Sequence, residues 1–154
     1  MKNDKMMLEV VRMKRIIAAC IITLLICCGC GKAEDPAEYD LTTKDGIQAY
    51  TEAYFKDNAH AKIDKITIND DAGTGSGFIL LVNLEYDRDD APAVIGKQIK
   101  ADSVAFAVDS QDLTEVNQLC LFWNIPQTGS EAKYQYKRVG NAFAEDDIVN
   151  PLAS

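Results

Sequence analysis

Two groups of aspartates are the residues of this 154-residue chain best suited to metal chemistry. Asp70 and Asp71 follow one segment of alternating apolar residues, and Asp87, Asp89 and Asp90 follow a second one. Carboxylate oxygens are the ligands that Ca²⁺ prefers, but neither group has the spacing of an EF-hand loop. We therefore expect solvated loop carboxylates rather than a metal site. A Ca²⁺-binding or hydrolytic envelope module that uses these two acidic loops is the alternative.

The other residues capable of chemistry are isolated. His60 is the only histidine, so a histidine metal site or a Cys-His nucleophile would depend on one residue. The glycine-rich segment 72–77 joins two expected strands, and no helix begins after it to hold a phosphate. The sequence therefore predicts no catalytic residues and no cofactor.

Three aromatic residues are candidates for a binding surface: Trp123, Tyr134 and Tyr136. They lie in segments that alternate apolar and polar residues, which is typical of half-buried strands. Such rings either fill a core or lie exposed where a protein or peptide binds. We expect the core, with an exposed surface as the alternative.

Two helices are expected to position these residues. The first follows a cap at Thr42 and runs to about Asp57, with apolar residues at helical spacing along one face. The second runs from Ala91 to about Asp109, and either Asp89 or Asp90 can cap its first turn. Between and after the helices, the apolar alternation predicts strands. These are Ile63–Ile68, Phe78–Tyr86, Leu113–Pro126 and Tyr134–Val139 with a continuation at Phe143, followed by a polar tail, Asp146–Ser154.

The order helix, strand, strand, helix, strand, strand predicts an α+β fold. One antiparallel sheet of four or five strands, with both helices on one face, would bury the apolar faces of all these elements. The segment Phe122, Trp123, Asn124, Ile125 and Pro126 resembles the Phe-Trp-x-x-Pro segment of small extracytoplasmic domains of unknown function in Gram-positive bacteria. The resemblance covers Ile47–Phe143, and it implies a fold without implying an activity.

The N-terminal segment has the order of an export signal. Lys14 and Arg15 precede an apolar run, Ile16–Ile26, which is followed by small residues and cysteines. The run makes roughly 16 Å of helix, about half of the ~30 Å that a membrane-spanning helix must cross. We therefore expect no permanent transmembrane helix. Met13 is the expected start of this signal.

At the end of the apolar run the chain resembles the lipobox of bacterial lipoproteins, with Gly29 before Cys30. The resemblance implies that the Cys30 thiol receives a diacylglyceryl group and that a signal peptidase cuts between Gly29 and Cys30. Cys27 and Cys28 stand where the family usually has Leu and a small residue, and Cys28 is the alternative lipidation site. Two acyl chains would hold the protein durably at a membrane.

These features divide the chain into residues 1–29, an extension and signal peptide, residues 30–40, a lipidated cysteine and polar tether, and residues 41–154, one domain. The net charge is −8, and residues 1–29 carry five basic and two acidic side chains, so the exported part is more acidic than the whole. This charge disfavours nucleic acid. Beyond Cys30 the only cysteine is Cys120, so an intramolecular disulfide is excluded. We expect a noncatalytic binding module outside the cytoplasm, whose partner is an envelope protein or peptide.

Overall fold

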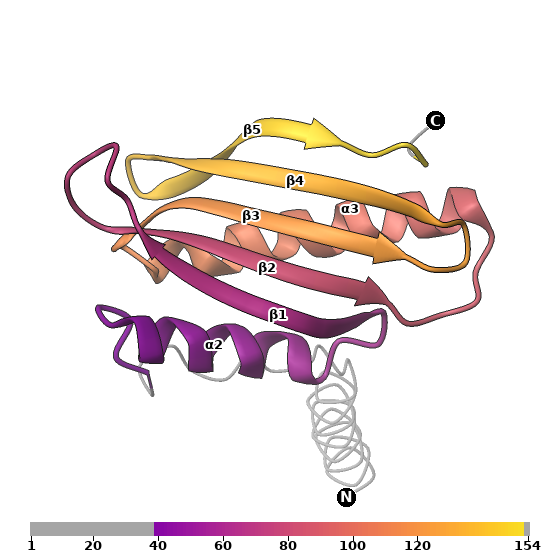
Figure 1. Cartoon of the computed structure of the whole chain (residues 1–154), viewed down its shortest axis with the longest axis horizontal. Helices are drawn as coiled ribbons and strands as arrows, with labels where there is room; N and C mark the ends of the chain where they lie inside the picture. The colour runs from indigo at the N-terminus through magenta and orange to yellow at the C-terminus, as the bar shows by residue number, and fades with distance from the viewer. Residues whose placement is uncertain (1–38, 153–154) are drawn as a thin grey trace, which may run out of the picture. The chain divides into compact units, whose positions relative to one another are not determined.

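The computed structural model describes residues 39–152, which form an α+β domain (Figure 1). The expected export signal, Cys30 and most of the tether lie outside the described residues. The elements in chain order are α2 (Lys44–Lys56), β1 (Ala61–Asp70), β2 (Phe78–Tyr86), α3 (Pro92–Asp109), the 3₁₀ turn η2 (Ser110–Asp112), β3 (Val116–Ile125), β4 (Ser130–Val139) and β5 (Ala142–Val149).

The strands form one five-stranded mixed sheet in the order β1-β2-β3-β4-β5. Three neighbouring pairs are antiparallel, but β2 and β3 are parallel, so the prediction of a wholly antiparallel sheet is wrong at this pair. The cause is α3, whose 18 residues span about 27 Å at ~1.5 Å per residue. This length is close to that of β2, so α3 returns the chain to the end at which β2 began. A strand that starts there runs in the same direction as β2.

β5 forms where the sequence predicted a polar tail from Asp146. It pairs with β4 up to Val149, which lies opposite Lys133. Most of its side chains are exposed, because β5 is an edge strand of the sheet. Backbone hydrogen bonds to β4 hold such a strand, and these do not depend on side-chain type. Its sequence therefore needs no apolar alternation from which a strand could be predicted.

α2 begins one residue later than expected. Thr43, not Thr42, is the N-cap, and its Oγ1 accepts a hydrogen bond from the Gly46 N–H at 3.1 Å. The Thr42 hydroxyl instead donates to the Asp40 carboxylate at 2.6 Å. The incoming chain passes so close to the helix that a Cβ on Gly46 would overlap the carbonyl oxygen of Asp40. A glycine here therefore permits the sharp entry into α2.

α3 lacks the aspartate cap that the sequence predicted. Its N-cap is Ala91, which makes no side-chain capping hydrogen bond. The Asp90 carboxylate accepts a hydrogen bond from the Tyr86 hydroxyl at 2.8 Å instead. The predicted cap at Asp89 or Asp90 is therefore wrong, because Asp90 ties the loop to the end of β2.

The C-terminal segment lies directly on α3 at Gly96. A Cβ on Gly96 would overlap the backbone carbonyl of Leu152, so only glycine permits this approach. The Asn150 side-chain amide donates to the Gly96 carbonyl at 3.0 Å and also to the Tyr134 hydroxyl. The Asn150 amide, just after β5, therefore ties the C-terminal segment to both α3 and β4.

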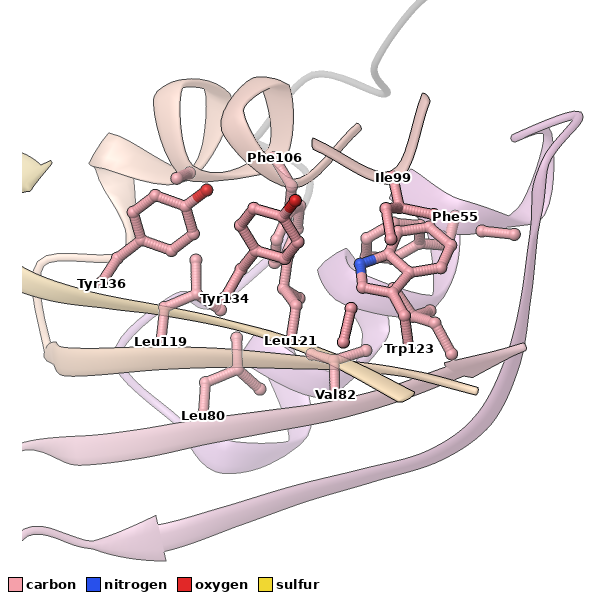
Figure 2. Packing of buried hydrophobic residues seen from close by; sticks show 14 of the residues in the cluster. Phe55, Leu80, Val82, Ile99, Phe106, Leu119, Leu121, Trp123, Tyr134 and Tyr136 are labelled. Atoms are coloured by element: carbon pink, nitrogen blue, oxygen red, sulfur yellow. The ribbon is translucent and has the colours of Figure 1, made fainter. Parts of the chain in front are cut away.

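Both helices cover the same face of the sheet, as expected, and the core lies between the two layers (Figure 1, Figure 2). The rings of Tyr54 and Phe55 on α2 both lie with their centroids 4.8 Å from that of Phe106 on α3, which joins the helices. Within the core, the Trp123 indole donates to the Ser103 hydroxyl at 2.9 Å. The side chains that β2 buries are those on the face predicted from its alternation: Leu80, Val82, Leu84 and Tyr86.

Candidate functional site

The three aromatic candidates belong to the core and do not form an exposed surface. Trp123, Tyr134 and Tyr136 are 1%, 0% and 2% exposed, and they point from β3 and β4 towards the helices (Figure 2). Burial raises the pKa of both tyrosines. The exposed alternative for these residues is therefore wrong, and the face that they occupy is closed to a partner.

The first acidic loop is held by its own hydrogen bonds. Asp71 accepts from the Asn117 side-chain amide at 3.0 Å and from the Gly73 N–H at 3.0 Å. The Asn117 hydrogen bond, followed by one from Thr74, lowers the pKa of the Asp71 carboxyl. Asp70 forms an ion pair with Lys44 at 2.8 Å. Both carboxylates therefore already have partners within the domain.

The second acidic loop lies at the other end of β2. Asp90 is bound to Tyr86 and is also 3.5 Å from the Arg88 guanidinium. The nine residues of β2 separate the two loops by roughly 30 Å, so their carboxylates do not converge on one cleft. In the described part of the chain, no group of three or more His, Cys, Asp or Glu side chains is placed to hold a metal ion.

His60 and Cys120 lie on opposite sides of the sheet. The His60 Nδ1 is 3.3 Å from a carboxylate oxygen of Asp102 on α3, and its ring stacks on Tyr86. Cys120 lies in the middle of β3 on the side away from the helices, and burial raises the pKa of its thiol. A histidine that contacts α3 cannot activate this thiol. His60 and Cys120 therefore do not form a Cys-His nucleophile.

A concave surface lies on the face of the sheet that carries no helix. In Figure 1 the strands are drawn in front of α3, so this helix-free face is turned to the viewer. The hollow has a volume of about 640 Å³, within the range of ~300–1,000 Å³ typical of ligand pockets. Its side chains come from two neighbouring cross-strand rows of the sheet. The first row is Asn83, Phe122, Lys133 and Val149, and the second is Glu85, Asn124 and Glu131, with Asp64 of β1 beside them.

Three carboxylates surround this hollow, and we call Asp64, Glu85 and Glu131 the acidic rim. Within residues 39–152, none of the three forms an ion pair or a side-chain hydrogen bond. Lys133, the one cation that lines the hollow, is bound to Asp147 at 2.8 Å, and this hydrogen bond raises the pKa of its amine. No cation of the described residues is therefore bound to the rim carboxylates, which lie beside the half-buried ring of Phe122.

Sequence reasoning missed this surface because it depends on the register of five strands. β-bulges at the edges of the sheet, near Asp64 in β1 and Asp146 in β5, set which side chains face the hollow. Such irregularities bend strands, and no local sequence pattern predicts them. One signal was available: Phe122 is out of phase with Leu121 and Trp123, so it must point away from the core.

Comparison with known proteins found no relative that could indicate a function for this hollow. Neither a protein-family model nor a curated protein matches the chain. Among the described residues, no helix combines the length and the apolar character needed to cross a membrane.

Proposed function

We propose that this chain is a lipid-anchored, noncatalytic binding module that works outside the cytoplasm and engages a protein or peptide through its helix-free concave face. The anchor is Cys30, as the resemblance to the lipobox implies. The described domain begins at Tyr39, so the intervening polar segment is short. The eight residues 31–38 reach at most about 28 Å when fully extended, which would keep the domain near the membrane.

The observation that carries the proposed binding role is a hollow whose acidic rim has no ion-pair or side-chain hydrogen-bond partner within residues 39–152. Polar groups that stabilise a fold are paired with one another, as Lys133 is with Asp147. The acidic rim is not paired, so it contributes little to the stability of the sheet. A concave surface that combines an aromatic ring with a few unpaired polar groups supports a ligand site.

The location is tested by mass spectrometry of the protein from the membrane fraction of its host. We expect a mature chain that begins at Cys30 and carries a diacylglyceryl group. A Cys30→Ala variant should remain uncleaved and unacylated. A mature chain that begins at Cys28 would move the anchor by two residues, whereas a full-length unacylated chain would contradict the location.

The binding face is tested by photo-crosslinking in the host cell. A photoreactive amino acid at Asn124, which lines the hollow, should cross-link a partner that mass spectrometry can identify. The matched control is Val108, which is 59% exposed on α3 in the helix layer. Cross-linking of the same partner from Val108, or of no partner from Asn124, would contradict a role for the helix-free face.

A further inference from the structure

The chemistry of the concave face indicates the class of its ligand. We propose that the hollow binds a short basic peptide segment, with an arginine or lysine side chain lying over Phe122 and between the carboxylates of the acidic rim. This inference rests on the proposed function, because it names the partner of the same face. Three properties of the hollow favour this ligand: its charge, its aromatic ring and its size.

The charge of the hollow favours a cation. The acidic rim draws Asp64 from β1, Glu85 from β2 and Glu131 from β4, so negative groups lie on more than one side of it. Glu85 and Glu131 both lie opposite Asn124 in the register, one on each side of it. A concave low-dielectric surface focuses the field of such groups and raises the local concentration of cations.

The basic residues nearby reduce this charge, but none of those in the described domain forms an ion pair with the acidic rim. The Lys133 amine is bound to Asp147 on β5, which removes it as a partner for Glu131. Lys62 and Lys65 lie on β1 opposite Glu85 and Asn83, but both are exposed, and within the described domain neither forms an ion pair. A cation that enters the hollow therefore meets carboxylates that are free to bind it.

Phe122 extends the preference from a simple cation to an amphipathic one. Its ring lies between Asn83 and Lys133 in the cross-strand row and is half-buried. A guanidinium or ammonium group over an aromatic face gains a cation–π interaction, and the methylene stem of Arg or Lys covers apolar surface. A hydrated metal ion would gain neither. Arginine should bind better than lysine, because its planar guanidinium also contacts carboxylates in a bidentate manner.

The size of the hollow favours a peptide over a single amine. A volume of about 640 Å³ is several times that of one side chain and suits a ligand of drug or short-peptide size. Asn83 and Asn124 provide amides that can bond a peptide backbone, and neither has a partner in the described residues. The hollow reaches Val149, which is 53% exposed on the edge strand, so a longer chain can leave in that direction.

The test measures the binding of dye-labelled peptides to the full chain in a neutral detergent by fluorescence anisotropy. The probes are Gly-Arg-Leu-Arg-Gly, its citrulline analogue without charge, and Gly-Glu-Leu-Glu-Gly. We expect the arginine peptide to bind and the other two to bind at least about fourfold more weakly, since two charge contacts and a cation–π contact are lost. Equal binding of the three probes would overturn the inference.

Three variants locate the binding. Glu85→Gln and Glu131→Gln each remove one rim charge with almost no change in shape, and each should weaken binding of the arginine peptide about two- to fivefold. Glu145→Gln is the matched control, because Glu145 is an exposed acid on β5 that does not line the hollow. It should leave the affinity unchanged. If Glu145→Gln weakens binding as much as Glu85→Gln does, net charge alone explains the affinity and the inference fails.

Failure of this inference can be separated from failure of the proposed function. If the cross-link from Asn124 persists while the arginine peptide does not bind, the helix-free face is a binding surface for another class of partner. If neither the cross-link nor the peptide binding is found, both proposals fail. Circular dichroism of each variant confirms that a loss of affinity does not reflect unfolding.

Discussion

The buried hydrogen bond between Ser103 and Trp123 provides the sharpest test of how this core is held. The Ser103 hydroxyl accepts from the Trp123 indole at 2.9 Å and donates to the Ile99 carbonyl at 2.6 Å. Both side chains are essentially inaccessible to solvent. In Ser103→Ala, the indole N–H therefore loses its acceptor and no water can replace it.

The expected loss of stability follows from these contacts. An unsatisfied buried donor costs about 1–3 kcal/mol, and the better helix propensity of alanine offsets this by up to about 0.5 kcal/mol. We expect the free energy of unfolding to fall by about 1–2 kcal/mol and Tm by roughly 4–8 °C for a domain of this size. Trp123 is the only tryptophan, so its fluorescence reports urea unfolding directly.

A control and a double-mutant cycle isolate the indole contact. Thr51 is also buried, and its hydroxyl donates to the Ile47 carbonyl, four residues earlier, at 2.8 Å. Unlike Ser103, it accepts no hydrogen bond from an indole. Thr51→Val should therefore cost less than Ser103→Ala. In a Trp123→Phe background, followed by circular dichroism, Ser103→Ala should cost almost nothing because the donor is gone. An equal cost in both backgrounds would refute the assigned role of the hydroxyl.

Four further outcomes are expected. Gly96→Ala should lower stability by about 1 kcal/mol or more although alanine favours helices, because its Cβ would overlap the C-terminal segment; a more stable variant in urea unfolding would contradict the contact. Arg138→Ala should cost about 2–3 kcal/mol, since its guanidinium donates to three backbone carbonyls, whereas exposed Lys137→Ala should change stability little. Burial raises the pKa of Tyr86 from 10.0 to about 12, so the fold favours its neutral form. The stability that this shift contributes is full below pH ~10 and declines as the pH rises towards ~12. Tyrosinate absorbance and urea unfolding at both pH values would check this decline. Cys120, whose thiol pKa is raised by burial, should be alkylated far more slowly in the folded chain than in urea, and equal rates by peptide mass spectrometry would refute its burial.

The elements with strong apolar periodicity were predictable from the sequence. The strand Phe78–Tyr86 has the predicted bounds, and its predicted face is buried. The two helices were placed to within two residues, because apolar residues at helical spacing must face a core. The cap of α2 was displaced by only one residue, since adjacent threonines are chemically equivalent candidates.

The sequence could not predict features that depend on how the elements meet. Local patterns gave the lengths of β2 and α3, but they do not encode which strands lie side by side, so the parallel pairing of β2 and β3 was missed. The role of Gly96 depends on Leu152, a residue far along the chain. The concave face was missed for the same reason: Asp64, Glu85 and Glu131 are distant in the sequence, and only the register of the sheet brings them around one hollow.

The single parallel strand pair also has a consequence for the kinetics of folding. Short connections join β1 to β2, β3 to β4 and β4 to β5, so those antiparallel pairs can form from contacts between neighbours in the chain. Joining β2 to β3 instead requires the loop that contains α3 to close, which is entropically slower. The two hairpin-containing halves should therefore form early and dock late, and substitutions that speed the formation of α3 should speed folding of the whole domain.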